Sequence, residues 1–239
     1  QDFKIWITLH YSDTWADPAH QVIPQAWQGL SFKTLKDSVY SYTKKIVATL
    51  HPDYIQIGNE INPGLLIPQG QISNNLDQFL SLVDTATKAV RLASNSTQII
   101  LHFAGIKGSD WFFNNLKTID YDIIGLSYYP IWHGKSLDSL EKCIKQLISN
   151  HQKKVIIAET AYPFTLKWND WTNNILGTED QLILPDFPAT PIGQRAFISS
   201  IKHITMNVKS CIGFCYWGGE LVAWKGNQAQ DGSPWENQA

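Results

Sequence analysis

Short apolar segments alternate along the chain with longer amphipathic segments. The short segments are rich in isoleucine, valine and aromatic residues and are too short for helices, so each predicts a buried strand. These strands are expected at Lys4–Leu9, Tyr54–Ile57, Gln98–Phe103, Ile123–Ser127, Val155–Ala158 and Ile212–Trp217.

The longer segments carry apolar residues on one face at helical spacing. The clearest helix is predicted at Phe32–Leu50, and others at about Leu76–Ala93, Leu137–Ile148 and Pro191–Val208. The last begins with a helix-start signal, because Thr190 can cap the helix and Pro191 suits its first turn. Strands that alternate with helices predict a parallel sheet.

The connections are unequal in length, which indicates where a ligand would bind. Long segments follow the predicted strands, at Tyr11–Leu30, Glu60–Asn75 and Thr160–Thr190, whereas the return connections are brief. Ligand sites in parallel α/β folds lie at the carboxyl ends of strands. Neither a GxGxxG motif nor a P-loop is present, so the pattern favours a (β/α)8 barrel over a nucleotide-binding fold. Six strand–helix units are visible, in a single domain over residues 1–239.

Composition narrows the possible partners. The chain has 239 residues, of which 44% are hydrophobic and 17% charged, as in an ordinary globular protein. A net charge of -2 gives no reason to expect nucleic acid binding. No apolar stretch approaches the roughly 20 residues of a membrane span. Many of the ten tryptophans fall outside the regular segments, where they could offer flat apolar surfaces to sugar rings.

Two predicted strands end in a carboxylate. The segment "IQIGNE" ends with Asn59 and Glu60, and "KKVIIAET" brings Glu159 to the end of a later strand. A retaining glycosidase needs one carboxylic acid to protonate the leaving oxygen and one carboxylate to attack the anomeric carbon. Asn59 favours this interpretation, since its amide could donate to a sugar 2-hydroxyl. Either glutamate alone could instead be a solvated strand end or an ion-pair partner.

The flanking sequence resembles glycoside hydrolase family 53, the endo-β-1,4-galactanases of clan A. The resemblance runs through the whole chain, in the motifs "LHYSDTWADPAHQ", "IQIGNEINPGLLIP", "GLSYYPIWHG", "IAETAYP" and "GSPWENQA". It implies retaining hydrolysis of β-1,4-galactan in pectin, with Glu60 as acid/base and Glu159 as nucleophile. It also implies a polysaccharide as partner and a secreted or periplasmic location, and it does not imply an oligomeric state.

The resemblance further implies a set of sugar contacts. Asn59 is expected at the 2-hydroxyl, with His10 and Tyr128 as hydrogen-bonding groups and Trp217 as an apolar floor. Neighbouring subsites are expected to use Asp13, Trp15, Trp132, His133, Trp224 and Trp235, although loop packing is an equal alternative for each of these alone.

We expect no catalytic metal and no required cofactor, because the sequence contains neither HExxH nor a Cys/His cluster. The segment Thr165–Pro188 looks unlike the bacterial loop that, in some members of the family, joins a structural calcium site. In the corresponding segment here, the acids Asp170, Glu179, Asp180 and Asp186 could bind such an ion, but scattered loop acids are usually solvated.

Two features depart from the family. The motifs number the first strand here as the third of the barrel, so an incomplete chain is expected, without the arginine that the family places on strand 2. Gly218 and Gly219 stand where a glutamate and a proline are more usual. Two alternatives therefore stay open, another clan A hydrolase for β-mannan or β-glucan, and a galactan-binding relic without activity.

Overall fold

The computed structural model describes residues 3–167 and 176–219. Within these ranges six strands form one sheet in the order β1-β2-β3-β4-β5-β6. Their bounds are β1 Trp6–Leu9, β2 Tyr54–Ile57, β3 Gln98–Ala104, β4 Ile123–Ser127, β5 Lys154–Thr160 and β6 Cys211–Tyr216. The pairs β1–β2, β2–β3 and β5–β6 are parallel, as the alternation of strands and helices predicts.

The chain divides into two compact units. Unit 1 comprises residues 1–104, 108–125 and 150–154, and unit 2 comprises residues 105–107, 126–149 and 155–239. The division passes through β4, so unit 1 holds β1 to β3 with the first part of β4, and unit 2 holds the rest of β4, β5 from Val155 and β6. The expectation of a single domain stays a prediction.

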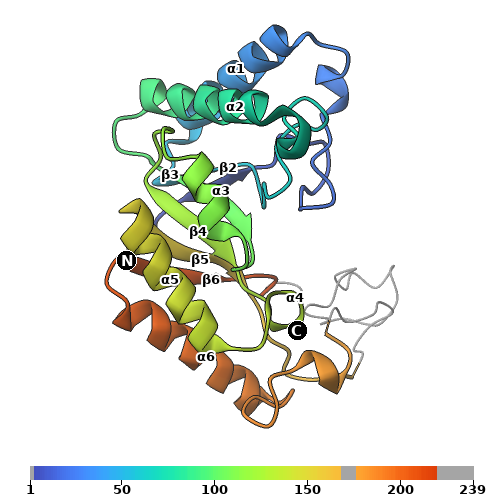
Figure 1. Ribbon diagram of the computed structural model, residues 1–239, viewed down its shortest axis with the longest axis vertical. Coiled ribbons are helices and arrows are strands. Elements are labelled where there is room, and N and C mark those ends of the chain that lie inside the picture. Colours follow the sequence, from blue (N-terminus) through green and yellow to red (C-terminus); the bar gives the residue numbers. More distant parts are fainter. Residues whose placement is uncertain (1–2, 168–175, 220–239) are drawn as a thin grey trace. The chain divides into compact units, whose positions relative to one another are not determined.

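Unit 1 is built around two long helices that lie side by side, α1 (Phe32–Leu50) and α2 (Ile72–Ala93) (Figure 1). The hydroxyl of Ser31 caps α1 by accepting from the main-chain N–H of Thr34 at 3.2 Å. Phe79 of α2 packs against Phe112 of the short helix α3 (Ser109–Asn115), with ring centroids 5.9 Å apart. Phe112 also packs against Phe103 of β3, with ring centroids 5.1 Å apart, so these buried rings join α2 and α3 to the sheet.

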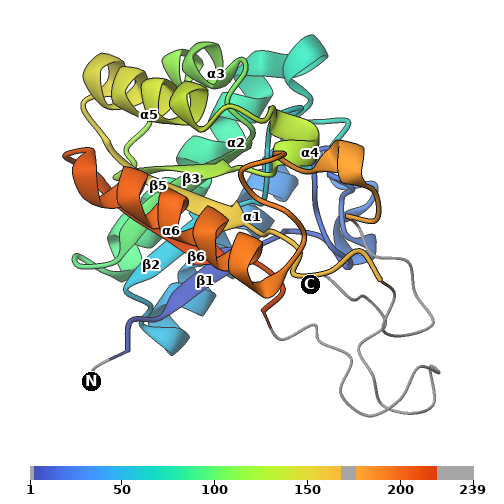
Figure 2. The same ribbon diagram turned by 90° about the horizontal axis from the view of Figure 1, so that it is seen from below.

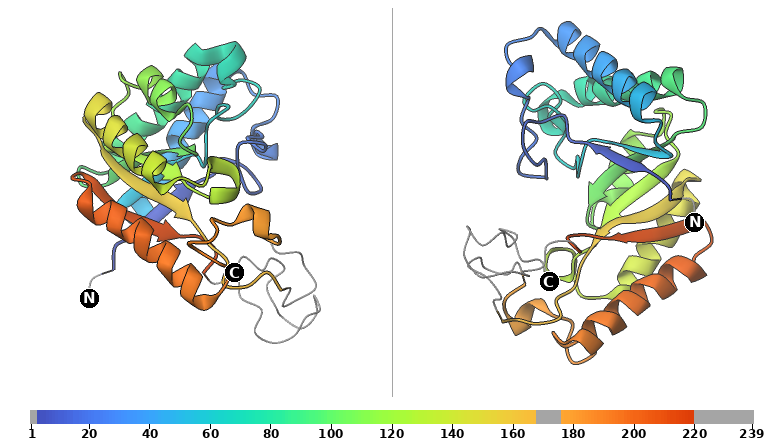
Figure 3. Two further views of the ribbon diagram at one scale, coloured as in Figure 1. Left: turned by 60° about the horizontal axis from the view of Figure 1, so that its bottom comes forward. Right: turned by 180° about the vertical axis from the view of Figure 1, so that it is seen from behind.

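Unit 2 contains α4 (Pro130–His133), most of α5 (Leu137–His151) and α6 (Pro191–Asn207). Figures 2 and 3 show α6 running beside β6, and the two elements are in contact. The hydroxyl of Thr190 accepts from the main chain of Gly193 at 3.0 Å, which confirms the predicted cap. Phe197 of α6 stacks on Tyr162, with ring centroids 4.3 Å apart, and forms the centre of this core.

The α/β fold class is confirmed as part of a (β/α)8 barrel with six consecutive strands. Each of the first five strands is followed by a helix. After β6 the described residues end at Gly219. Helix α2 begins four residues before the predicted start at Leu76, with a non-helical Asn75 near its beginning. Within the described residues, no helix is long and apolar enough to cross a membrane.

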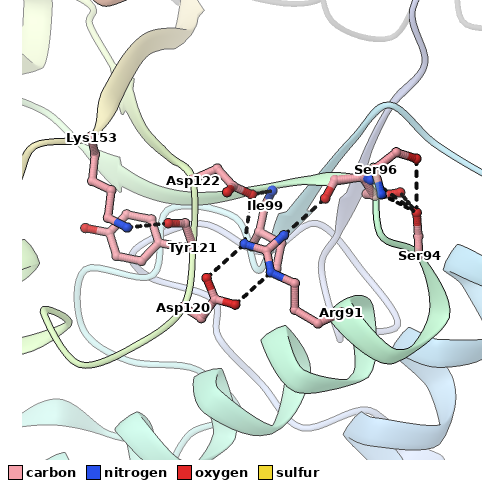
Figure 4. A network of polar contacts seen from close by, with 9 residues as sticks. Arg91, Ser94, Ser96, Ile99, Asp120, Tyr121, Asp122 and Lys153 are labelled. Atoms are coloured by element: carbon pink, nitrogen blue, oxygen red, sulfur yellow. Dashed lines mark hydrogen bonds and ion pairs between the residues drawn. The ribbon is translucent and has the colours of Figure 1, made fainter.

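An ion-pair network joins the end of α2 to the start of β3 (Figure 4). The guanidinium of Arg91 donates to both carboxylate oxygens of Asp120, at 2.8 and 3.0 Å, and to Asp122 at 3.0 Å. Asp122 in turn accepts from the main-chain N–H of Ile99 at 2.7 Å. The hydrogen bond from Arg91 lowers the pKa of Asp120. The network therefore fixes where β3 begins relative to α2.

We predict that Arg91→Met lowers the free energy of unfolding at neutral pH by about 1–2 kcal/mol, a range discounted because Asp120 is exposed. The pKa of Asp120 is lower in the folded protein, so its stabilisation is present above its unfolded value and is lost as the pH falls. The deficit of the variant should therefore shrink on acidification from about pH 5 toward pH 2.

Urea unfolding at several pH values measures this effect. Arg195→Met is the matched control, because Arg195 is exposed on α6. Equal losses for the two variants, or a deficit at Arg91 that does not change with pH, would contradict the assigned role of the network.

Candidate active site

Glu60 follows β2 in a tight turn that buries it. The turn begins at Gly58, with φ of +73°, where a Cβ would lie 2.4 Å from Cγ2 of Ile61. Glu60 itself adopts φ of +50°, an uncommon conformation for a non-glycine residue. Asn59 and Glu60 are only 8% and 9% exposed. A buried carboxylate on a strained turn is the kind of feature that collects at functional sites.

A layer of buried amides supports this turn. The side-chain amide of Gln56 donates to Oδ1 of Asn59 at 2.9 Å and to the carbonyl of Gly58 at 3.1 Å. From the loop after β1, Gln21 donates to the carbonyl of Asn59 at 2.7 Å. Asn59 in turn donates from Nδ2 to the carbonyl of Ala16 at 2.9 Å. The amides therefore tie the Asn59–Glu60 turn to the loop after β1.

His102, fully buried on β3, completes the support. Its Nδ1 lies 3.0 Å from Oδ1 of Asn59 and 3.0 Å from Nε2 of Gln56. The main-chain N–H of Glu60 points at the same nitrogen from 3.4 Å. Sequence reasoning did not include His102, Gln56 or Gln21 in the site.

The loop after β1 carries three predicted sugar contacts, His10, Asp13 and Trp15. Nδ1 of His10 accepts from the main chain of Ala16 at 2.8 Å, and burial lowers the pKa of the imidazole. The ring is therefore neutral, with its proton on Nε2. Trp15 is 63% exposed and meets His10 edge-on, with ring centroids 5.9 Å apart. Asp13 accepts from the main chain of Gln25 at 2.6 Å, and all three residues line a cavity of about 580 Å³.

Glu159 lies near the end of β5 and is half-buried. Its carboxylate oxygen Oε2 accepts a hydrogen bond of 2.9 Å from the hydroxyl of Tyr129. Its carbonyl accepts from the main chain of Tyr128 at 2.8 Å, which joins the ends of β4 and β5. Burial and the charge of Glu159 both raise the pKa of the Cys215 thiol. A carboxylate with one oxygen held by a hydroxyl donor can act as a nucleophile.

Tyr128 and Tyr129 occupy different environments despite their adjacency. Tyr128 is fully buried, and its hydroxyl donates to the carbonyl of Gly134 at 2.7 Å. Tyr129, which sequence reasoning did not select, is the tyrosine whose hydroxyl reaches Glu159. Trp132 is 58% exposed beside Tyr129, with ring centroids 5.3 Å apart. Nδ1 of His133 accepts from the main chain of Tyr129 at 2.9 Å, and burial lowers the pKa of His133 to about 4.

The other predicted contacts lie at the end of β6 and beyond. Trp217 is half-buried, and its main chain donates to the carbonyl of Thr160 at 3.0 Å. Trp224 and Trp235 lie outside the described residues, as does Asp170, one of the four loop acids that were weighed as calcium ligands. Glu179 and Asp180 are exposed on a short 3-10 helix, where Lys135 donates to the Asp180 carbonyl. In the described part of the chain, Glu179, Asp180 and Asp186 belong to no group of three metal-ligating side chains.

Comparisons with known proteins agree on one family. The family model described as "Glycosyl hydrolase family 53" matches residues 1–239. An arabinogalactan endo-beta-1,4-galactanase of Cellvibrio japonicus is 36% identical over 98% of this chain. The solved structure of an Ignisphaera aggregans GH53 catalytic domain is 35% identical, covers 99% of this chain and superposes with a TM-score of 0.87. A structure from a study of two fungal beta-1,4-galactanases is 28% identical over 98%, with a TM-score of 0.78.

The matches cover only part of each relative. The chain spans 66% of the length of the Cellvibrio japonicus protein, 69% of the Ignisphaera aggregans chain and 72% of the fungal chain.

We predict that Gln56→Leu destabilises the fold by about 3 kcal/mol, because it leaves the buried acceptors on Gly58 and Asn59 without their donor. Gln98→Leu is the control, since Gln98 is half-buried at the start of β3. It should change the free energy of unfolding by less than about 0.5 kcal/mol. Chemical denaturation of both variants gives the comparison. A Gln56 variant as stable as its control would mean that the amides do not support the Asn59–Glu60 turn.

Proposed function

This chain belongs to glycosyl hydrolase family 53, and on that premise we propose that it hydrolyses β-1,4-galactosidic bonds within galactan chains of pectin, with retention of configuration. The observation that carries the proposal is the family match over all 239 residues. The chain also carries Glu60 and Glu159, which correspond to the two strand-end glutamates that the family resemblance implies. The printed names of curated relatives from Cellvibrio japonicus and Bacillus subtilis supply the substrate. Because the substrate is a polymer, we also propose that the protein acts outside the cytoplasm.

Glu159 is the proposed nucleophile. Its carboxylate attacks the anomeric carbon of the bound galactosyl residue and forms a covalent glycosyl-enzyme while the glycosidic bond breaks. The hydroxyl of Tyr129, 2.9 Å from Oε2, holds one oxygen of the carboxylate. That contact supports the role, because it limits the orientations available to the attacking group.

Glu60 is the proposed acid/base. In the first step its carboxylic acid protonates the departing glycosidic oxygen. In the second step its carboxylate takes a proton from water, whose oxygen attacks the anomeric carbon and releases Glu159. Burial of Glu60 supports this assignment, since a low-dielectric position helps a carboxyl group to hold a proton at the start of the cycle.

Two exposed tryptophans, the neutral imidazole of His10 and the amide of Asn59 are the proposed sugar contacts. Trp15 and Trp132 offer ring faces to solvent from the loops that follow β1 and β4. His10 keeps its Nε2 proton available for donation, because its Nδ1 accepts from the main chain. Asn59 uses Nδ2 to hold Ala16, and its second amide proton is proposed to donate to the sugar 2-hydroxyl.

A substrate panel tests the proposed activity. Release of reducing sugar is measured on β-1,4-galactan, β-mannan and β-glucan with the 239-residue chain. The proposal expects release from galactan alone. Release from mannan or glucan would reassign the substrate. Failure on all three, with galactan retained in affinity electrophoresis, would leave a binding protein in place of an enzyme.

We predict that Glu159→Ala lowers kcat on galactan by at least about 10⁴-fold while leaving the affinity for galactan within about threefold, since the variant lacks the nucleophile but keeps its aromatic contacts. Glu179→Ala is the control, because Glu179 is exposed on the 3-10 helix. Steady-state kinetics and affinity electrophoresis separate the two effects. Retained turnover in the Glu159 variant would remove the residue from the role proposed here.

A further inference from the structure

Two hydrogen bonds join the start of the segment Tyr128–Gly134 to its end. At one side, the hydroxyl of Tyr128 donates to the carbonyl of Gly134 at 2.7 Å. At the other, the main-chain N–H of Tyr129 donates to Nδ1 of His133 at 2.9 Å. The four-residue helix α4 lies between these two contacts. The segment therefore forms a closed loop at the carboxyl end of β4.

The imidazole of His133 has little freedom to move within this loop. Gly105, the residue after β3, adopts φ of +93°, and a Cβ placed there would lie 2.9 Å from Cδ2 of His133. The ring thus stands directly against the main chain of Gly105. Because Nδ1 accepts from Tyr129, the proton of the neutral ring lies on Nε2.

The imidazole of His133 accepts from the main chain of Tyr129, and the side chain of Tyr129 contacts Glu159. The hydroxyl of Tyr129 donates to Oε2 of Glu159 at 2.9 Å, and the main chains of the two strands are joined by the 2.8 Å bond from Tyr128 to the Glu159 carbonyl. A shift in the main chain of Tyr129 would move its hydroxyl relative to a carboxylate that β5 holds in place.

We propose that His133 is a positioning residue, which holds the main chain of Tyr129 through Nδ1 so that the tyrosine hydroxyl stays aimed at Glu159. This inference rests on the proposed function, in which Glu159 is the nucleophile. This role differs from the sugar contact expected of His133. The positioning role uses Nδ1, which bonds to the protein main chain, whereas a sugar contact would use Nε2.

Two substitutions separate the roles that His133 could have. Asn carries an oxygen at the position of Nδ1 and can still accept from Tyr129, whereas Gln places its polar atoms near the position of Nε2. Gln also fills more of the space of the ring. A packing role or a sugar contact through Nε2 therefore favours Gln, and the positioning role favours Asn.

Kinetics on galactan give the first readout. His133→Gln should lower kcat about tenfold with KM within about twofold, as expected for a displaced group near the reacting atoms, and His133→Asn should restore most of the loss. The acidic limb of the kcat/KM profile should move to higher pH in His133→Gln, because Glu159 loses a donor to its charged form. Gln outperforming Asn would overturn the proposal.

A double-mutant cycle identifies the path of the effect. If His133 acts through the hydroxyl of Tyr129, then Tyr129→Phe combined with His133→Gln should be no slower than Tyr129→Phe alone. Independent losses that multiply in the double variant would overturn the proposal, since His133 would then act by another route.

An NMR titration of the carboxyl carbons of ¹³C-labelled glutamate gives a readout that does not need activity. The Glu159 resonance, assigned with Glu159→Gln, should titrate at higher pH in Tyr129→Phe and His133→Gln than in wild type and His133→Asn. That pattern in a protein inactive on galactan would overturn the proposed function and leave the positioning role intact. An active protein without the pattern would overturn the positioning role alone.

Discussion

Parallel pairing of neighbouring strands is the constraint on which the rest of this structure depends. A parallel pair needs a crossover between its strands, so every strand is followed by a long excursion that starts at its carboxyl end. The pairs β1–β2, β2–β3 and β5–β6 obey this rule, and α1, α2 and α6 provide the returns. Of the two proposed catalytic carboxylates, Glu60 lies in the turn after β2 and Glu159 lies near the end of β5.

Much of the fold was predictable because its elements are long or strongly patterned. The helix at Phe32–Leu50 has the predicted bounds, and α6 begins at Pro191 as its cap signal indicated. The helices α3 and α4 were missed. α3 has seven residues and includes the aromatic run Trp111–Phe113, which has low helix propensity, and α4 is a single turn. Such helices form because tertiary packing supports them, and periodicity cannot be read over so few residues.

The part of the candidate site that could be predicted consists of residues whose type and place after a strand are visible in the sequence. A glutamate at the end of a buried strand is visible in the sequence, and so is an asparagine beside it. The supporting residues were not visible, because their roles depend on which strands are neighbours. Gln56 on β2 and His102 on β3 meet only once these two strands pair. Tyr128 and Tyr129 are adjacent just after β4, yet the hydroxyl of Tyr128 donates to Gly134 and only that of Tyr129 reaches Glu159, which the sequence does not distinguish.

The central claim is that Glu159 attacks the anomeric carbon and Glu60 transfers the proton. It is tested most directly by trapping the covalent intermediate with a 2-deoxy-2-fluoro-β-galactobiosyl fluoride, whose electron-withdrawing fluorine slows breakdown of the glycosyl-enzyme. Peptide mass spectrometry then locates the sugar. The account predicts one fluorogalactobiosyl group on the peptide that contains Glu159, and none in Glu159→Ala. A label on the peptide that contains Glu60 would contradict it.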